Sequence, residues 1–224
     1  MGIDFEAARQ KLVDNQIRTT DVTSHSVLKA FLTVAREDFV PASLRPLAYI
    51  DADLEISPAG EGRPARYLME ASPLAKMLQL AAITKTDVVL EVGCGTGYVC
   101  ALLSLMAGSV VAVECDADLA AEATATLSAG GYDNVAIVTG PLENGCPNEA
   151  PFDVIVVSGA VDEVPQDLLA QLRDGGRLVA VIGHGGAAKA HLFVRDGDTF
   201  SGRPAFNASV MPLPGFEKKA EFVF

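Results

Sequence analysis

The stretch from Val88 to Tyr98, VVLEVGCGTGY, determines how the rest of the chain is interpreted. Its first five residues form a near-continuous apolar run, which is typical of a strand buried on both faces of a parallel sheet. The pattern Gly-x-Gly-x-Gly follows from Gly93 to Gly97, and apolar residues at helical spacing begin at Tyr98. Glycines let a ligand approach the backbone closely, although an ordinary tight turn between strand and helix favours them too. The stretch therefore predicts a strand, a glycine loop and a helix, with the loop as a candidate binding site.

The segments after this loop alternate between strand and helix patterns. Strands are predicted at residues 110–114, 135–139, 152–158 and 177–182, and helices at residues 98–107, 117–129 and 165–172. This alternation is typical of βαβ units, with helices on both faces of a doubly wound, mostly parallel sheet. Residues 190–195, 205–211 and 221–224 show strand patterns without intervening helices. We therefore predict an α/β fold with an antiparallel tail at one sheet edge.

The first 82 residues show a different pattern, of helices and loops. Helices are predicted at residues 5–17 and 26–35, and prolines and glycines then indicate irregular chain. A third helix is predicted to begin at Ser72, a good N-cap, with Pro73 in the first helical position. We expect a single domain over residues 1–224, in which residues 1–82 form an N-terminal helical extension of a core made by residues 83–224.

Composition and charge argue against several classes of partner. The formal net charge is −12, from 29 acidic and 17 basic residues, so a nucleic-acid partner is not expected. No apolar stretch is long enough to span a membrane, and no secretory leader is recognisable. The four cysteines, Cys94, Cys100, Cys115 and Cys146, lack the spacing of a zinc site. We interpret them as reduced thiols of a cytoplasmic protein without a metal.

Two acidic residues beside the glycine loop indicate the class of cofactor. Glu114 ends the next predicted strand, where a carboxylate can bind both ribose hydroxyls of a nucleoside. Glu91 precedes the loop, and its charge would repel a pyrophosphate but attract an ammonium group. Charge therefore favours S-adenosylmethionine over NAD, provided that the loop leaves room for a nucleoside. The alternative role for Glu91 is to cap nearby backbone or to pair with a lysine or arginine.

Five segments, which lie within a resemblance that covers about residues 15–183, are specific when taken together. They are VAREDFVP (34–41), AYIDADL (48–54), LEVGCGTGY (90–98), APFDVI (150–155) and QLRDGGRLV (171–179). In this order and spacing they resemble the protein-L-isoaspartate O-methyltransferase family of class I S-adenosylmethionine-dependent methyltransferases. The resemblance implies a seven-stranded, Rossmann-like sheet. It also implies protein repair by methylation of L-isoaspartyl or D-aspartyl carboxylates, with S-adenosyl-L-homocysteine as product.

The residues expected to contact the cofactor follow the strands of the core. They are Glu91, Gly93, Cys94, Gly95, Gly97, Glu114, Cys115, Leu142, Glu143 and Ser158. After the strand ending at Thr139 the family has Gly-Asp-Gly, with the acid near the adenine, whereas this chain has Gly-Pro-Leu-Glu. Either Glu143 reaches the adenine amino group or Leu142 packs on the ring. Ser158 either lines the site or only forms the turn at a strand end.

The expected acceptor side departs from the family. A Gly-Gln-Thr-Ile-Ser segment there is set against Arg66-Tyr67-Leu68-Met69, so that Met69 stands in place of the serine. Carboxylates are ionised at neutral pH, and methylation therefore needs no general base. Either Arg63 or Arg66 orients an acidic acceptor, or both are surface residues paired with acids. Tyr67 either supplies the missing hydroxyl or packs as an aromatic ring.

Three functions follow as hypotheses from these departures. The first is a protein carboxyl methyltransferase for L-isoaspartyl residues of proteins or peptides, with altered acceptor contacts. The second is a methyltransferase of the same fold for another acceptor, such as a small acid. The third is a protein that binds S-adenosylmethionine with little turnover. The sequence is compatible with a monomer or a homodimer.

Overall fold

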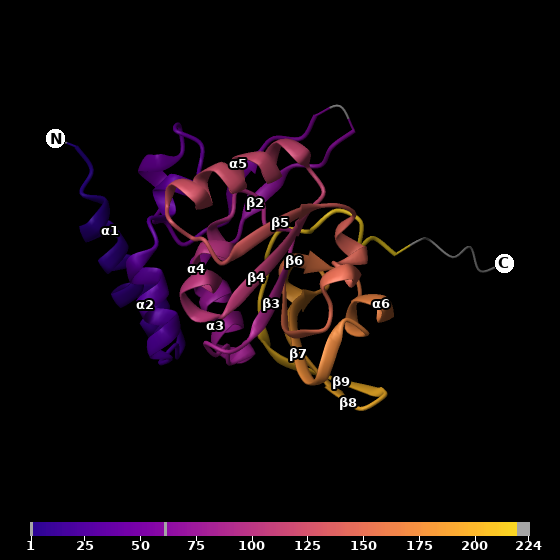
Figure 1. The fold of residues 1–224 in the computed structure, drawn as a ribbon. Helices are drawn as coiled ribbons and strands as arrows, with labels where there is room; N and C mark the ends of the chain where they lie inside the picture. Colours follow the sequence, from indigo (N-terminus) through magenta and orange to yellow (C-terminus); the bar gives the residue numbers. More distant parts are fainter. Residues whose placement is uncertain (1, 61, 219–224) are drawn as a thin grey trace.

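A seven-stranded sheet forms the centre of the molecule (Figure 1). The computed structural model describes residues 2–60 and 62–218. In spatial order the strands are β5 (Val135–Thr139), β4 (Ser109–Glu114), β3 (Val88–Val92), β6 (Phe152–Val161), β7 (Leu172–Ile182), β8 (Lys189–Asp196) and β9 (Thr199–Asn207). The first five are parallel, and β8 and β9 are added antiparallel. The predicted α/β fold with an antiparallel tail is therefore confirmed.

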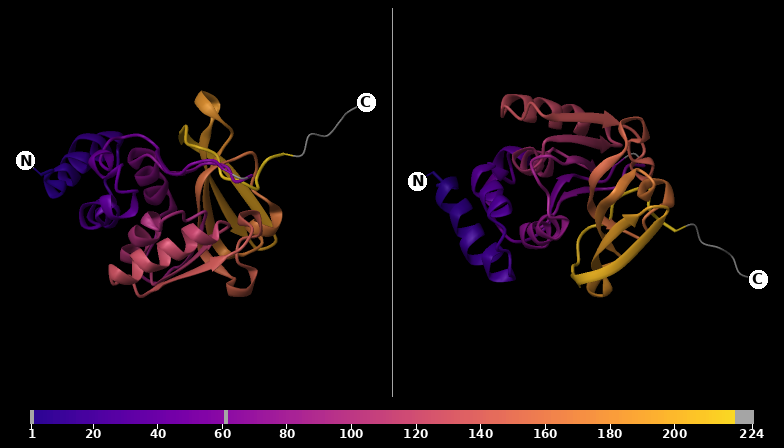
Figure 2. Two further views of the ribbon diagram at one scale, coloured as in Figure 1. Left: turned by 90° about the horizontal axis from the view of Figure 1, so that it is seen from above. Right: turned by 60° about the horizontal axis from the view of Figure 1, so that its bottom comes forward.

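Helices cover the two faces of the sheet unequally. Strand residues alternate between two apolar clusters, so that Val89 packs with the helices of one face while Leu90 faces the other. The helices are α1 (Phe5–Leu12), α2 (His25–Thr33), α3 (Ala71–Ala81), α4 (Tyr98–Met106), α5 (Ala117–Ala129) and α6 (Gln166–Leu169). The first five contribute to the cluster of Val89, whereas α6 and residues 213–216 after β9 cover the opposite face (Figure 2).

The N-terminal extension contains a hairpin that was not predicted. Strands β1 (Leu54–Ser57) and β2 (Arg66–Leu68) pair antiparallel, separately from the main sheet. Figure 2 shows the hairpin beside the segment that follows β9, and Met211 N–H donates to Asp53 Oδ2 at 3.2 Å between them. The sequence predicts irregular chain here because prolines and glycines interrupt the short strands.

The start of the third helix was predicted too late. Helix α3 begins at Ala71, and Ser72 lies inside it rather than at the N-cap. The carboxylate of Asp51 accepts hydrogen bonds from Ser72 N–H at 3.2 Å and from Ser72 Oγ at 2.7 Å. Asp53 accepts a further bond from Glu70 N–H at 2.7 Å. Acids distant in sequence therefore satisfy the free N–H groups that a local cap would otherwise bind.

The C-terminal elements differ from the predicted bounds as well. The strand expected at 205–211 is β9, because a tight turn at Gly197 brings Thr199 opposite Asp196. After β9 the chain returns to β6, where Ala160 N–H donates to Met211 O and Leu213 N–H donates to Ala160 O, both at 2.9 Å. The helix expected at 165–172 is the single turn α6, because β7 already begins at Leu172. The strand predicted at 221–224 lies outside the described residues.

Candidate functional site

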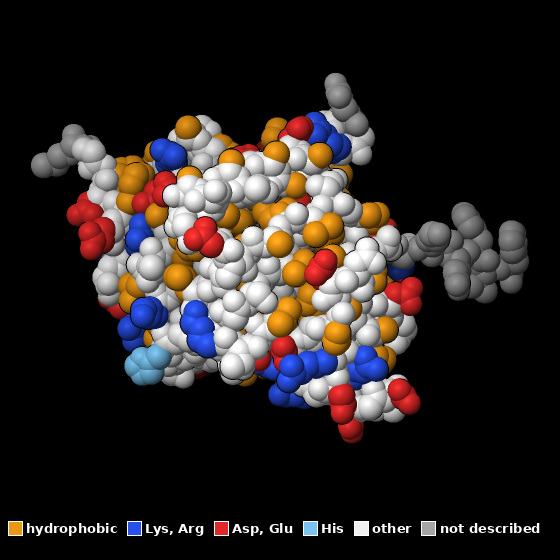
Figure 3. Space-filling model, viewed as in Figure 1, with side chains coloured by type: hydrophobic (Ala, Val, Ile, Leu, Met, Phe, Trp, Pro, Cys, Tyr) orange, Lys and Arg blue, Asp and Glu red, His pale blue; other side chains and the backbone are white. Residues whose placement is uncertain are grey.

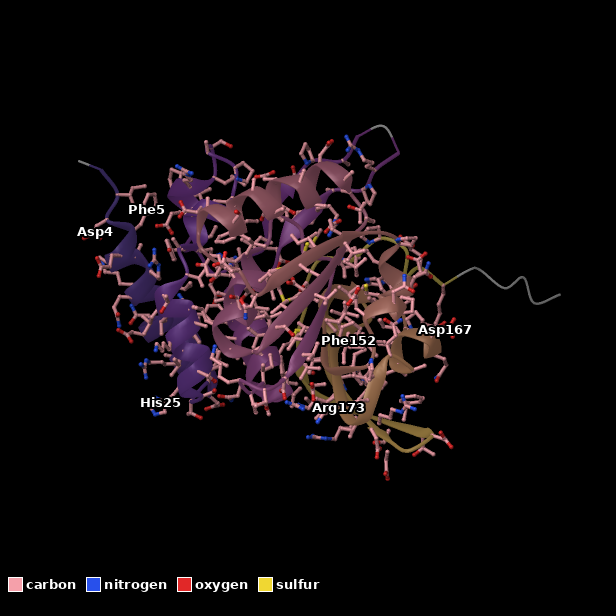
Figure 4. All side chains as sticks on the ribbon, viewed as in Figure 1. Asp4, Phe5, His25, Phe152, Asp167 and Arg173 are labelled. Atoms are coloured by element: carbon pink, nitrogen blue, oxygen red, sulfur yellow. The ribbon has the colours of Figure 1, made fainter. Side chains whose placement is uncertain are left out.

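The glycine loop turns sharply between β3 and α4. Gly93, Gly95 and Gly97 all have positive φ angles, of 83°, 55° and 93°, a backbone conformation that other L-residues adopt only with strain. The loop is held by Gly93 N–H, which donates to Val113 O at 2.9 Å, and by Thr96 Oγ, which donates to Phe39 O at 2.6 Å. It lies at the carboxyl ends of the parallel strands, where ligands bind in open α/β sheets. The other end of these strands, near the labelled Phe152 and Arg173, is shown in Figure 4.

Glu114 lies directly beside the loop, as predicted. Its buried carboxylate accepts hydrogen bonds from the backbone N–H groups of Gly95 at 2.8 Å, Cys115 at 2.8 Å and Asp116 at 3.1 Å. It also forms a two-point ion pair with Arg66, in which Nη2 and Oε2 are 2.8 Å apart. Burial alone would raise the pKa of Glu114, but Arg66 and the backbone donors lower it below its ordinary value. The carboxylate is thus ionised and fixed against the glycine loop.

Glu91 neither caps nearby backbone nor pairs with a described lysine or arginine, the two alternatives to a role in cofactor binding. Its carboxylate is fully buried and accepts hydrogen bonds from Ser158 Oγ and Cys100 Sγ, both at 2.8 Å. Among residues 2–60 and 62–218, it therefore bonds neither to a backbone donor nor to a lysine or arginine. Burial raises its pKa to about 7. Ser158 is brought to the site, but it contacts Glu91 rather than open space.

Apolar side chains pack directly against the glycine loop. A Cβ atom at Gly93 would lie 2.7 Å from Leu213 Cδ2, one at Gly159 would lie 2.6 Å from Leu213 Cγ, and one at Gly95 would lie 2.6 Å from Ile56 Cδ1. One cavity at this edge has about 80 Å³ and is lined by Arg63, Pro64, Arg66, Cys115, Asp116 and Pro214. Ile56 and Leu213 thus pack directly against the glycine loop, and the expectation that the loop leaves room for a nucleoside stays a prediction.

The side chains that contact the glycine loop come from segments that are distant in sequence. Ile56 comes from β1 and Leu213 from the segment after β9, and no local pattern in the sequence connected either one with the loop. Residues 54–57, Leu-Glu-Ile-Ser, do alternate between apolar and polar residues, and this alternation was a signal that could have revealed β1. The polar groups at this edge suit a nucleoside that carries an ammonium group.

The acceptor-side candidates do not converge on one point. Arg63 is exposed and pairs with Asp116 at 3.2 Å and with Asp118 at 3.3 Å. Arg66 is buried against Glu114, and Tyr67 OH donates to Glu55 Oε2 at 3.2 Å. Both arginines therefore pair with acids, and only Arg63 is a surface residue. Met69 is packed in the apolar core with 4% of its surface exposed.

The adenine-side candidates lie at the same edge of the sheet. Leu142 is buried in a short 3₁₀ turn, and Glu143 lies beside Gly215, where an added Cβ would be 2.5 Å from Glu143 Oε2. Cys94 is buried and Cys115 is exposed. Glu143 thus lies against the segment after β9, and its contact with an adenine stays a prediction.

Larger hollows lie away from this site. One of about 550 Å³ runs between α5 and β5, where Figure 3 shows hydrophobic side chains gathered on the surface. Its lining includes Ala121 and Ile137 but no residue of the glycine loop. Within the part of the chain that the structure describes, no group of three or more His, Cys, Asp or Glu side chains suits a metal ion. Among the same residues, no helix has both the length and the apolar character needed to cross a membrane.

Comparison with known proteins connects this geometry to a family. The family described as "Protein-L-isoaspartate(D-aspartate) O-methyltransferase (PCMT)" matches residues 7–217. A protein-L-isoaspartate O-methyltransferase of Koribacter versatilis (strain Ellin345) is 41% identical over 179 residues, which are 80% of this chain and 78% of that protein. One from Roseiflexus castenholzii (strain DSM 13941 / HLO8) is 38% identical over 213 residues, covering 95% and 94%.

Solved structures share the fold. A protein-L-isoaspartate O-methyltransferase structure has a TM-score of 0.79 and 29% identity, covering 92% of this chain and 66% of that one, slightly less than two thirds of its length. A Plasmodium falciparum chain assigned to the same activity, in complex with S-adenosyl-L-homocysteine, has a TM-score of 0.75 at 18% identity and covers 95% of this chain and 99% of its own. This second likeness shows the fold alone. On the strength of its sequence relatives, the chain belongs to the protein-L-isoaspartate(D-aspartate) O-methyltransferase family.

Proposed function

We propose that this chain transfers the methyl group of S-adenosylmethionine to the free carboxylate of L-isoaspartyl residues in proteins and peptides. Family membership over residues 7–217 supports both the reaction and the cofactor. The observation that carries the proposal is the position of Glu114, buried 2.8 Å from the backbone N–H of Gly95. A fixed carboxylate beside a glycine loop is the arrangement that binds a ribose at the carboxyl end of a parallel sheet.

The residues of the chain supply binding and orientation. Gly93 to Gly97 would let the cofactor approach the backbone, and Glu114 would accept hydrogen bonds from ribose hydroxyls. Glu91 lies buried behind the loop and would attract an ammonium group when ionised. When bound, S-adenosylmethionine supplies an already activated methyl group, so that the protein mainly positions the acceptor oxygen and excludes water.

A second candidate is the methylation of a different acidic acceptor. Met69, which aligns with the family's serine, is packed in the core, and the Tyr67 hydroxyl donates to Glu55. Neither residue therefore supplies the hydroxyl that the family places beside its acceptor. Loss of one such hydrogen bond costs about 1–3 kcal/mol and does not prevent the reaction.

Product formation with defined acceptors distinguishes these candidates. The chain is incubated with S-adenosylmethionine and an isoaspartyl peptide, and S-adenosylhomocysteine and the peptide methyl ester are measured by mass spectrometry. The same peptide with ordinary aspartate is the control. We expect ester on the isoaspartyl peptide only. Turnover with a small carboxylic acid alone would select the second candidate, and binding without any turnover would select a cofactor-binding protein.

The cellular location that we propose is the cytoplasm. All four cysteines are free thiols, and three of them are buried. Free thiols persist in reducing compartments, whereas secreted proteins usually form disulfides. Fractionation of cells that express the tagged chain would test the location.

A further inference from the structure

Arg66 is bound to the carboxylate of Glu114, the group that the proposed function assigns to binding the cofactor. Arg66 lies on β2 and is 5% exposed, and its guanidinium donates to both oxygens of Glu114. Nη1 also lies 3.6 Å from Cys115 Sγ. Arg66 and Glu114 are 48 positions apart, so their ion pair joins the N-terminal hairpin to the end of β4.

This ion pair leaves Glu114 no acceptor site for another ligand. A carboxylate offers about four lone-pair sites. Arg66 uses two of them, and the N–H groups of Gly95, Cys115 and Asp116 donate three further bonds. Ribose hydroxyls could bind Glu114 only after the guanidinium has left. The backbone donors would then still stabilise the carboxylate.

The hairpin closes the cleft as one unit. Ser57 of β1 pairs with Arg66 of β2, and Ile56 next to Ser57 covers Gly95. A displacement that removes Arg66 from Glu114 therefore also moves Ile56 away from the glycine loop. A cavity of about 80 Å³ lies beside the ion pair, lined by Arg63, Arg66 and Cys115 among others.

We propose that the β1–β2 hairpin is a gate over the cofactor cleft and that Arg66 is its latch. The proposal rests on the proposed function, since it assumes that the cleft binds S-adenosylmethionine. Because only open molecules bind, the apparent cofactor affinity is the intrinsic affinity multiplied by the fraction of molecules that are open.

Calorimetric titration with S-adenosylhomocysteine tests the latch. Arg66→Gln removes the cation and leaves Glu114 its three backbone donors. We expect this variant to bind at least about tenfold more tightly than the wild type, since it no longer breaks a buried ion pair on binding. Arg173→Gln is the matched control, because Arg173 forms an ion pair with Asp153 at 2.6 Å near the other end of the sheet (Figure 4). Its affinity should stay within about threefold of wild type.

The opposite results would overturn the gate. Equal or weaker binding by Arg66→Gln means that Arg66 does not hold the cofactor out. Binding by none of the three chains overturns both the gate and the cofactor assignment, whereas equal binding by all three overturns the gate alone. A crystal structure of the wild type with S-adenosylhomocysteine is decisive even if Arg66→Gln fails to fold. We expect Arg66 separated from Glu114 in that complex, and an intact ion pair beside bound ligand would overturn the proposal.

Discussion

Ser158 Oγ donates a hydrogen bond of 2.8 Å to Oε1 of Glu91. The other oxygen of this carboxyl group accepts from Cys100 Sγ at 2.8 Å, so that both partners are neutral donors. Full burial raises the pKa of Glu91 to about 7, despite these two hydrogen bonds. The end of β3 therefore holds a group that changes charge near neutral pH, immediately before the glycine loop.

Cofactor affinity should depend on the charge of Glu91. An ammonium group is attracted by the ionised carboxylate, which is the minor form below pH 7. We expect the affinity for S-adenosylhomocysteine to rise by about fivefold between pH 6 and 7 and to level off above about pH 8. Calorimetry on the wild type and Glu91→Gln measures the effect. The variant should lose this pH dependence, and an identical slope in both chains would show that another group is responsible.

Stability should depend on pH through the same residue. The pKa of Glu91 is about 7 in the folded chain against an ordinary value of 4.5, so the unfolded state loses its proton first as the pH rises. The wild type should therefore lose stability relative to Glu91→Gln between pH 4.5 and 7, by on the order of 3 kcal/mol. Urea unfolding of both chains at pH 5 and pH 8 provides the measurement. A constant difference between the two chains would contradict it.

Removing the Ser158 hydroxyl should cost more stability at high pH. At pH 8 the hydroxyl donates to a charged carboxylate, and Ser158→Ala should lower the free energy of unfolding by about 1.5–3 kcal/mol. At pH 5 the carboxyl is neutral, and about 1 kcal/mol is expected. Ser104→Ala is the control, because Ser104 is equally buried and bonds to the uncharged amide of Asn134. Unfolding curves in which both variants respond alike to pH would refute this account.

Two glycine substitutions should separate binding from stability. Gly95 has a φ of 55° and lies in the proposed cofactor site. Gly95→Ala should lower the free energy of unfolding by about 1–2 kcal/mol. It should also weaken the binding of S-adenosylhomocysteine at least about tenfold, because a displaced loop no longer fits the ligand. At Gly108 an added Cβ would lie 2.9 Å from the backbone oxygen of Lys85, away from the loop. Gly108→Ala should lower the melting temperature and leave the affinity unchanged. Comparable loss of affinity in both variants would place the cofactor elsewhere.

Local patterns predicted the core because local interactions form it. The strands Val88–Val92 and Val135–Thr139 and the helix Ala117–Ala129 have the predicted bounds. The helix begins where Asp116 accepts hydrogen bonds from the N–H groups of the first turn, a cap encoded within a few residues. Glu114 lies beside Gly95 as expected, because neighbouring parallel strands bring their carboxyl ends to the same edge.

The amino-acid sequence by itself determined the α/β fold, the family and the acidic residues beside the glycine loop, since periodicity and motif spacing encode them within short segments. Only the tertiary structure decided which groups lie above that loop. Arg66, Ile56 and Leu213 come from a hairpin and a C-terminal segment that are remote in sequence from Gly95. Contacts of this kind depend on how separate elements pack, and the short-range patterns of either segment do not contain that information.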